Sequence, residues 1–211
     1  SNFHIFLPFC IASLTSMNRF NLLLLFFVSL TTHSQASWVM QERERPDSWT
    51  ISSNEYGYIY ARVNGQVIFG DGLRLTLNGK TDRCENAVLG TSWYIGPDPS
   101  NLANDLEDTV ITVEAFGGEI EALIALVTEH GKGEKVAWVN IIKTDTADME
   151  DVLGVMNEEF DTVEMTIKPT KSFRADKIFP SPRNSWSLEG SMEAFGRARQ
   201  LCKRMIEDTI T

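Results

Sequence analysis

Short segments that alternate apolar and polar residues are the feature that most constrains how this chain can fold. The clearest is Tyr56–Val63, in which Tyr56, Tyr58 and Tyr60 fall on one face of a strand and smaller residues on the other. Side chains alternate across a strand with a period of two, so this pattern is typical of a sheet and not of a helix. The chain is therefore expected to be rich in strands.

Two turn signals follow this first strand. Asn64-Gly65 and Asp71-Gly72 both match the two-residue hairpin pattern, because the central positions of a type I′ turn need positive φ. They separate two further short apolar segments. The sequence therefore predicts a β-meander with strands at Tyr56–Val63, Gln66–Gly70 and Leu73–Leu77.

The rest of the chain adds more strands and two helices. Glu119–Val127 fits helical spacing and strand alternation equally well, and the glycine turns on both sides of it favour a strand. The other predicted strands are Ala87–Ile95, Thr109–Phe116, Lys135–Lys143 and Thr162–Lys168, and the predicted helices are Thr146–Phe160 and Ser191–Ile206. We expect a mainly β (α+β) fold, an antiparallel β-sandwich or open barrel with one internal helix and a C-terminal helix.

The N-terminal segment resembles a secretory signal. Met17 is followed by Arg19, by the apolar run Leu22–Leu30 and by small residues before Ser37. Nine apolar residues are too few to cross a bilayer as a helix, which argues against an uncleaved anchor. We expect residues 1–16 to be an upstream, non-native extension and 17–36 a signal peptide. Residues 37–211 would then form a single mature β-rich domain, ordered from about residue 48, in the bacterial periplasm or outside the cell.

The charge of the chain limits its partners. Arg19 is the only charged residue among the first 36, so the remaining 175 residues carry 18 basic and 29 acidic side chains, a net charge of −11. A nucleic-acid-binding surface is cationic, so we expect no nucleic-acid partner. On the same ground we do not expect anionic membrane surfaces as partners, and the acidity favours a basic partner.

Export changes how the three cysteines are interpreted. Cys10 lies before the predicted cleavage site, which leaves Cys84 and Cys202 as an even pair in an oxidising compartment. A redox-active or metal-binding pair is the alternative, but the chain has no CxxC motif and His130 is the only histidine after residue 36. A structural disulfide between Cys84 and Cys202 is therefore expected.

The C-terminal run from Trp186 to Cys202 (WSLEGSMEA, then a helix carrying a cysteine) is similar to the closing motif of two groups of small exported bacterial proteins. These are the invasion-associated-locus-B type and the TagO/VasI accessory proteins of type VI secretion. The resemblance covers about 70 of the 175 mature residues, and the N-terminal half lacks the cysteine-rich leader of those families. It implies a periplasmic accessory or interaction role and supplies no catalytic residue.

Motifs for catalysis or metal binding are scarce. His130, in a glycine-rich turn, is the sole candidate base, and no G-x-S-x-G elbow or phosphate-binding glycine motif occurs. A zinc site needs three or four ligands in one place, and one histidine with an oxidised cysteine pair argues against it, so we expect no metal and no cofactor. The acidic loop 98–108 is expected to be solvated, with calcium binding as the alternative; its carboxylates are Asp98, Asp105, Glu107 and Asp108.

Tyr56, Tyr58 and Tyr60 are the candidate binding residues. Tyrosine rows on a strand can stack against peptides or sugars, and tyrosine is enriched at recognition surfaces. The alternative is that the row packs against the Leu73–Leu77 strand or a covering helix. We expect an exported, non-catalytic envelope protein that binds a protein or envelope component. A small carboxylate-dependent hydrolase or a glycan-binding protein is the alternative.

Overall fold

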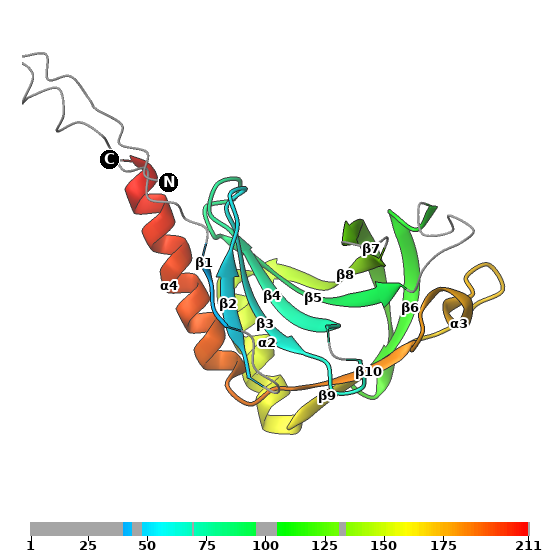
Figure 1. Ribbon diagram of the computed structural model, residues 1–211. Coiled ribbons are helices and arrows are strands. Elements are labelled where there is room, and N and C mark those ends of the chain that lie inside the picture. Colours follow the sequence, from blue (N-terminus) through cyan, green and yellow to red (C-terminus); the bar gives the residue numbers. More distant parts are fainter. Residues whose placement is uncertain (1–39, 44–47, 69, 96–104, 131–133, 211) are drawn as a thin grey trace, which may run out of the picture. The chain divides into compact units, whose positions relative to one another are not determined.

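The alternating segments form ten antiparallel strands that belong to one sheet (Figure 1). The structure is a computed structural model that describes residues 40–43, 48–68, 70–95, 105–130 and 134–210. The strands are β1 (Met40–Gln41), β2 (Thr50–Ser53), β3 (Tyr58–Asn64), β4 (Gly72–Asn78), β5 (Asn86–Ile95), β6 (Thr109–Ala115), β7 (Gly118–His130), β8 (Glu134–Asp145), β9 (Thr162–Ile167) and β10 (Arg183–Ser187). The helices are α2 (Thr146–Glu159), α3 (Ala175–Ile178) and α4 (Ser191–Ile210).

The chain divides into two units, Ser1–Ala36 and Ser37–Thr211. The first unit contains none of the described residues, so the predicted extension and signal peptide lie outside them. In the second unit, order begins earlier than residue 48, because Met40 and Gln41 pair with Ser53 and Ser52 of β2. None of the helices among the described residues is both long and apolar enough to span a bilayer.

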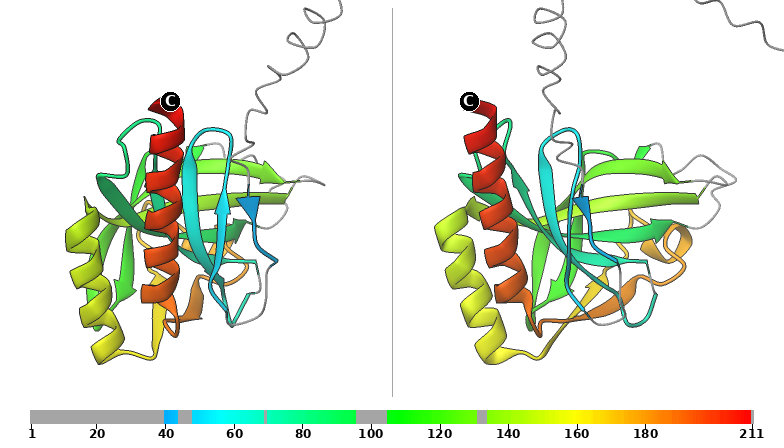
Figure 2. Two further views of the ribbon diagram at one scale, coloured as in Figure 1. Left: turned by 90° about the vertical axis from the view of Figure 1, so that its left-hand side faces the viewer. Right: turned by 60° about the vertical axis from the view of Figure 1, so that its left-hand side comes forward.

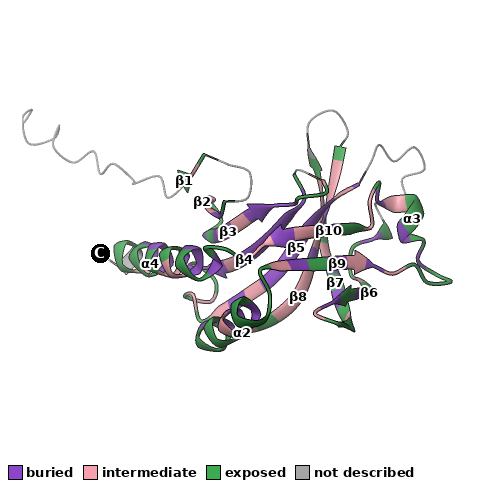
Figure 3. Cartoon of the chain, turned by 90° about the horizontal axis from the view of Figure 1, so that it is seen from below, coloured by how far each residue is buried: buried purple, intermediate pink, exposed green. Residues whose placement is uncertain are grey.

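One face of the sheet, here called the core face, carries the hydrophobic core. On β3 and β4 the paired residues are Ile59 with Leu77, Ala61 with Leu75 and Val63 with Leu73, and all six are fully buried. Each of the valine, leucine and isoleucine side chains among them contributes about 1.5–3 kcal/mol when it leaves water. Buried positions run along the central strands, whereas the outward sides of the helices are exposed (Figure 3).

The helices α2 and α4 lie side by side against the core face (Figure 2). α4 packs on β2, β3 and β4, and α2 packs on β5 and β8. The buried side of α4 carries Phe195, Ala198, Leu201, Cys202 and Met205, an apolar stripe at helical spacing. Its exposed side is charged, which explains why this helix stays on the surface of the domain.

The sheet curls until its last strand reaches the loop between β3 and β4. The amide of Gln66 donates to Ser185 O at 2.9 Å, and the Asn184 side chain accepts from Val67 N and donates to Asp71 Oδ2, both at 2.9 Å. Beneath these bonds the rings of Trp93 and Trp186 meet edge to face, 5.5 Å apart. The mainly β fold is confirmed, and the single curled sheet corresponds to the open barrel of the two expected alternatives.

The predicted meander is wrong in its middle strand. β3 pairs directly with β4, Asn64 opposite Gly72, and the described residues 65–68 between the two strands form a loop that is hydrogen-bonded to β10. Gly65 does not have the positive φ of a type I′ turn. A Cβ at Gly65 would overlap the Asn184 side chain, so glycine is needed there for close approach and not for turn geometry.

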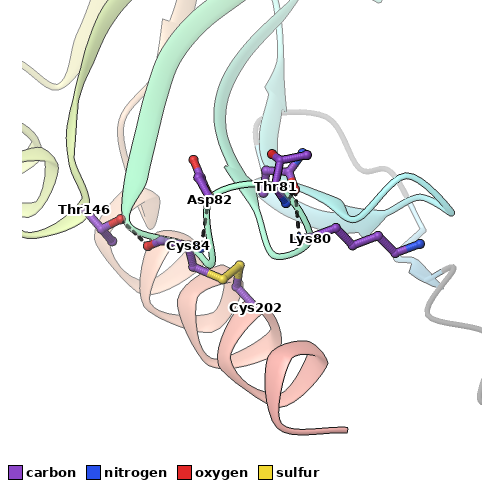
Figure 4. The surroundings of a disulfide bond; sticks show 7 residues. Lys80, Thr81, Asp82, Cys84, Thr146 and Cys202 are labelled. Atoms are coloured by element: carbon purple, nitrogen blue, oxygen red, sulfur yellow. Dashed lines mark hydrogen bonds between the residues drawn. A yellow bond between two sulfur atoms is a disulfide. The ribbon is translucent and has the colours of Figure 1, made fainter. Parts of the chain in front are cut away.

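The disulfide between Cys84 and Cys202 is present, with Cα atoms 6.2 Å apart (Figure 4). It joins the loop between β4 and β5 to α4 across 118 positions of sequence. The same loop also holds the start of α2, because Thr146 Oγ1 donates to Cys84 O at 2.7 Å. The predicted pairing is therefore confirmed, and it fixes both helices to one end of the barrel.

A buried carboxylate, Asp71, lies where the barrel closes. It accepts hydrogen bonds from Tyr94 N and Asn184 Nδ2, yet burial dominates and raises the pKa of Asp71 from its ordinary 3.8 to about 6. The folded state therefore holds this proton more tightly than the unfolded state does. The resulting stabilisation is complete below about pH 4 and is lost as the pH rises through 6.

We expect Asp71→Asn to remove this pH dependence. A shift from 3.8 to about 6 represents about 3 kcal/mol of unfolding free energy in total, and about 2 kcal/mol of it is lost between pH 4 and pH 7. Urea unfolding of the wild type and the variant at both pH values measures it. The variant loses one acceptor and is less stable at both, but its difference between the two pH values should be smaller by that amount. Equal pH dependence in the two proteins would contradict the assignment.

Candidate functional site

The face of the sheet opposite the core carries an unusual set of side chains. Residues directly opposite each other in an antiparallel pair point to the same face, so the register defines this set. We call it the outer-face band: Tyr58 and Tyr60 of β3, Arg74 of β4, Trp138 of β8, Leu123 and Leu126 of β7 and Val110 of β6. Its apolar members are open to solvent, with Val110 60% and Leu126 46% exposed.

The three candidate tyrosines separate into two groups. Tyr58 and Tyr60 lie on β3 with their rings stacked 6.1 Å apart, and Tyr60 OH accepts from Asn54 Nδ2 at 3.3 Å. Tyr56 precedes the strand, in a turn, and is 67% exposed. The alternative in which the row packs on Leu73–Leu77 is wrong, because those leucines are buried on the core face.

Arg74 is the charged residue at the centre of the band. Its guanidinium carbon lies 4.1 Å from the centroid of the Trp138 ring, and Trp138 Nε1 donates to Thr128 Oγ1 at 2.7 Å. Only 8% of Arg74 is exposed. Burial lowers the pKa of Arg74 to about 10, with Tyr60 opposing this effect and Arg62 adding to it. The side chain therefore remains charged at neutral pH.

A glycine makes room for one of the two arginines on this face. Arg62 lies directly opposite Arg74 on the neighbouring strand, and it extends over Gly72 to donate to Gly70 O. A Cβ on Gly72 would overlap Arg62 Nε, whereas one on Gly90 would overlap the backbone oxygen of Val139. Glycine at position 72 of β4 is therefore needed for the Arg62 side chain to lie across the strand.

A hollow of about 260 Å³ adjoins the band beside β1, β2 and β3. Polar groups line it, including Gln41, Ser52 and Asn54, together with Tyr60 and Arg62 from the band side. Glu42 is the carboxylate among its lining residues, and its two oxygens accept from Ile51 N and Arg197 Nη1 at 2.9 Å. The lining of the hollow can therefore stack against a ligand and form hydrogen bonds with it. The Glu42 carboxylate already holds neighbouring parts of the chain.

The remaining candidates are dispersed. His130 is the last residue of β7, opposite Glu134. Asp105, Glu107 and Asp108 are exposed at the start of β6, and Asp98 lies outside the described residues. Within the described part of the chain, His, Cys, Asp and Glu side chains form no group of three or more that could hold a metal ion.

Sequence reasoning missed Arg74 and Trp138. A signal for Arg74 existed, since it alternates with the buried leucines of β4 and so must point away from the core. The sequence does not reveal the register of β3, β4, β5 and β8. That register is what places Arg74 beside Tyr60 and Trp138. Comparison of the chain with models of protein families, with curated proteins and with solved structures found no match.

Proposed function

We propose that this chain is a non-catalytic accessory protein of the bacterial envelope that binds a protein partner through the outer-face band. The observation that carries the proposal is an exposed row of aromatic and aliphatic side chains on a sheet face that neither long helix covers. Tyrosine, tryptophan and arginine are the residues most enriched at protein–protein interfaces and among those that dominate binding energy. The resemblance of the C-terminal part to exported accessory proteins agrees with this role.

Export to the periplasm or the medium is part of the proposal. The signal-like segment before Ser37 and the Cys84–Cys202 disulfide both support an oxidising compartment. We expect the N-terminal sequence of the exported protein, measured by Edman degradation or mass spectrometry, to begin at Ser37. A mature protein that begins upstream of Ser37 would contradict the proposed cleavage.

The tyrosine pair gives a matched test of the binding surface. Tyr58→Ala removes a 39% exposed ring from the band, so folding should be retained and partner affinity should fall about tenfold or more. Tyr56→Ala removes the same side chain from the neighbouring turn, outside the band, and should leave affinity unchanged. Affinities from calorimetry or biolayer interferometry with the captured partner measure both. Equal affinities for the two variants would count against the band.

The alternative function suggested by the sequence is a hydrolase that acts through carboxylates. It would need two carboxylates converging on one cleft. The hollow beside β1, β2 and β3 has Glu42 alone among its described lining residues, and both oxygens of Glu42 hold neighbouring elements. The geometry therefore favours binding over hydrolysis.

A further inference from the structure

Arg74 is a buried charge whose partners leave most of its donors unused. A guanidinium has five N–H donors, and among the described residues Arg74 makes a single, long hydrogen bond, from Nη2 to Asn140 Oδ1 at 3.4 Å. Its Nε has no hydrogen-bond partner, and among the residues that the structure describes no carboxylate forms an ion pair with it. Buried charges in proteins are normally paired, so this one indicates a missing anion.

The surroundings of Arg74 reinforce this indication. Arg62 lies directly across the strand pair, and like charges in that position repel each other. Thr76, two residues further along β4 and on the same face, has a buried hydroxyl with no hydrogen-bond partner in the described part of the chain. A negatively charged group placed among Arg74, Arg62 and Thr76 would reduce the repulsion between the two arginines. It would also accept hydrogen bonds from the N–H donors that Arg74 does not use.

The kind of anion follows from the neighbours of the site. The aromatic neighbours of Arg74 are Tyr60 and Trp138, and beyond Trp138 lie the exposed Leu123 and Leu126. A singly charged carboxylate costs less to transfer from water to such surroundings than a doubly charged phosphate does. Arginine also matches the two oxygens of a carboxylate in a planar, bidentate geometry.

We propose that Arg74, assisted by Arg62, Tyr60 and Thr76, binds a carboxylate that the protein partner presents between apolar side chains. The inference rests on the proposed function and specifies the chemistry of its site. Although the acidity of the chain as a whole favours a basic partner, the band is a local cationic and aromatic surface. The partner segment is therefore an acidic residue flanked by leucine-like residues, which would cover Leu123 and Leu126.

A titration of the isotope-labelled exported protein tests this without any mutation. The Arg74 Nε–H and Trp138 Nε1–H resonances are followed by NMR while sodium acetate, sodium phosphate or sodium chloride is added at constant ionic strength. We expect saturable shifts of both resonances with acetate and none with chloride. Absence of a saturable acetate shift overturns the proposal, and tighter binding of phosphate than of acetate overturns the choice of carboxylate.

Two further probes separate a peptide from an acidic sugar. The capped tripeptide Leu-Glu-Leu should bind at least tenfold more tightly than acetate, because its leucines contact the band, and glucuronate should not. Tighter binding of glucuronate than of the tripeptide would overturn the peptide assignment. Arg74→Lys keeps the charge but loses the planar pair of donors, so it should lower the affinity for the tripeptide at least tenfold. Arg183→Lys, at an exposed arginine paired with Glu164, is the matched control and should have no effect.

The outcomes for this site and for the proposed function are distinguishable. If Arg74→Lys leaves partner affinity unchanged while Tyr58→Ala lowers it, the band remains the interface and the carboxylate site is refuted. If the tripeptide binds as expected while Tyr58→Ala leaves partner affinity unchanged, the carboxylate site stands and the proposed docking of a protein partner on the band fails.

Discussion

We expect Cys202→Ser to lower the free energy of unfolding of this protein by about 4–5 kcal/mol. The disulfide closes a loop of 118 positions, and the chain-entropy model assigns a stabilisation of that order to so long a loop. For a domain of this size, the loss corresponds to a fall in melting temperature of roughly 10–20 °C. Thermal and urea unfolding under non-reducing conditions measure it.

The position of the substitution matters for the control. Cys202 is completely buried, so a serine hydroxyl there adds a cost of its own, whereas Cys84 is only partly buried in its loop. Cys84→Ser removes the same disulfide without burying a new polar group as deeply, and it should account for most of the loss. If neither variant differs from the wild type under non-reducing conditions, the disulfide does not form in the exported protein.

We expect Trp186→Ala to lower the free energy of unfolding by about 3–5 kcal/mol, the second large effect. Trp186 is fully buried, packs edge to face on Trp93 with centroids 5.5 Å apart, and donates from Nε1 to Asp71 O at 3.4 Å. Its removal leaves a cavity at the point where β10 meets the loop between β3 and β4. We therefore also expect faster hydrogen exchange of Gln66 N–H, which donates to Ser185 O of β10.

Trp138→Ala is the matched control for this prediction. Trp138 is of the same size but lies on the outer face and is partly exposed, so its removal should cost less than about 2 kcal/mol and leave the exchange of Gln66 unchanged. Losses of equal size at the two tryptophans would contradict the distinction between a core face and an outer face.

Local alternation was enough to predict most of the elements. The strands from β5 to β9 and the helices α2 and α4 lie where the pattern placed them, and the ambiguous Glu119–Val127 is strand as expected. The fold class followed from these elements. The short α3 and the pairing of Met40 with Ser53 were not foreseen, because two- to four-residue elements have too little periodicity to detect.

The glycines of the sequence predicted local structure least reliably. Gly65 and Gly72 were interpreted as turn residues, whereas both make room for a side chain that crosses them, Asn184 at the first and Arg62 at the second. Such close approaches connect residues far apart in the sequence, and nothing local reveals them. The outer-face band was not predicted for the same reason. Register shifts at Leu89/Gly90 and at Ile124/Leu126 help to determine which of its residues are neighbours, and they are not visible in the sequence.

The proposed function requires that a partner docks on the outer-face band. Site-specific photo-crosslinking in the producing cell tests it most directly, with the crosslinking amino acid at Leu126 of the band or at the exposed Glu158 of α2. We predict one discrete adduct from Leu126 that is lost when Tyr58→Ala is added, and none from Glu158. An adduct from Glu158 alone, or a Leu126 adduct unaffected by Tyr58→Ala, would contradict the claim.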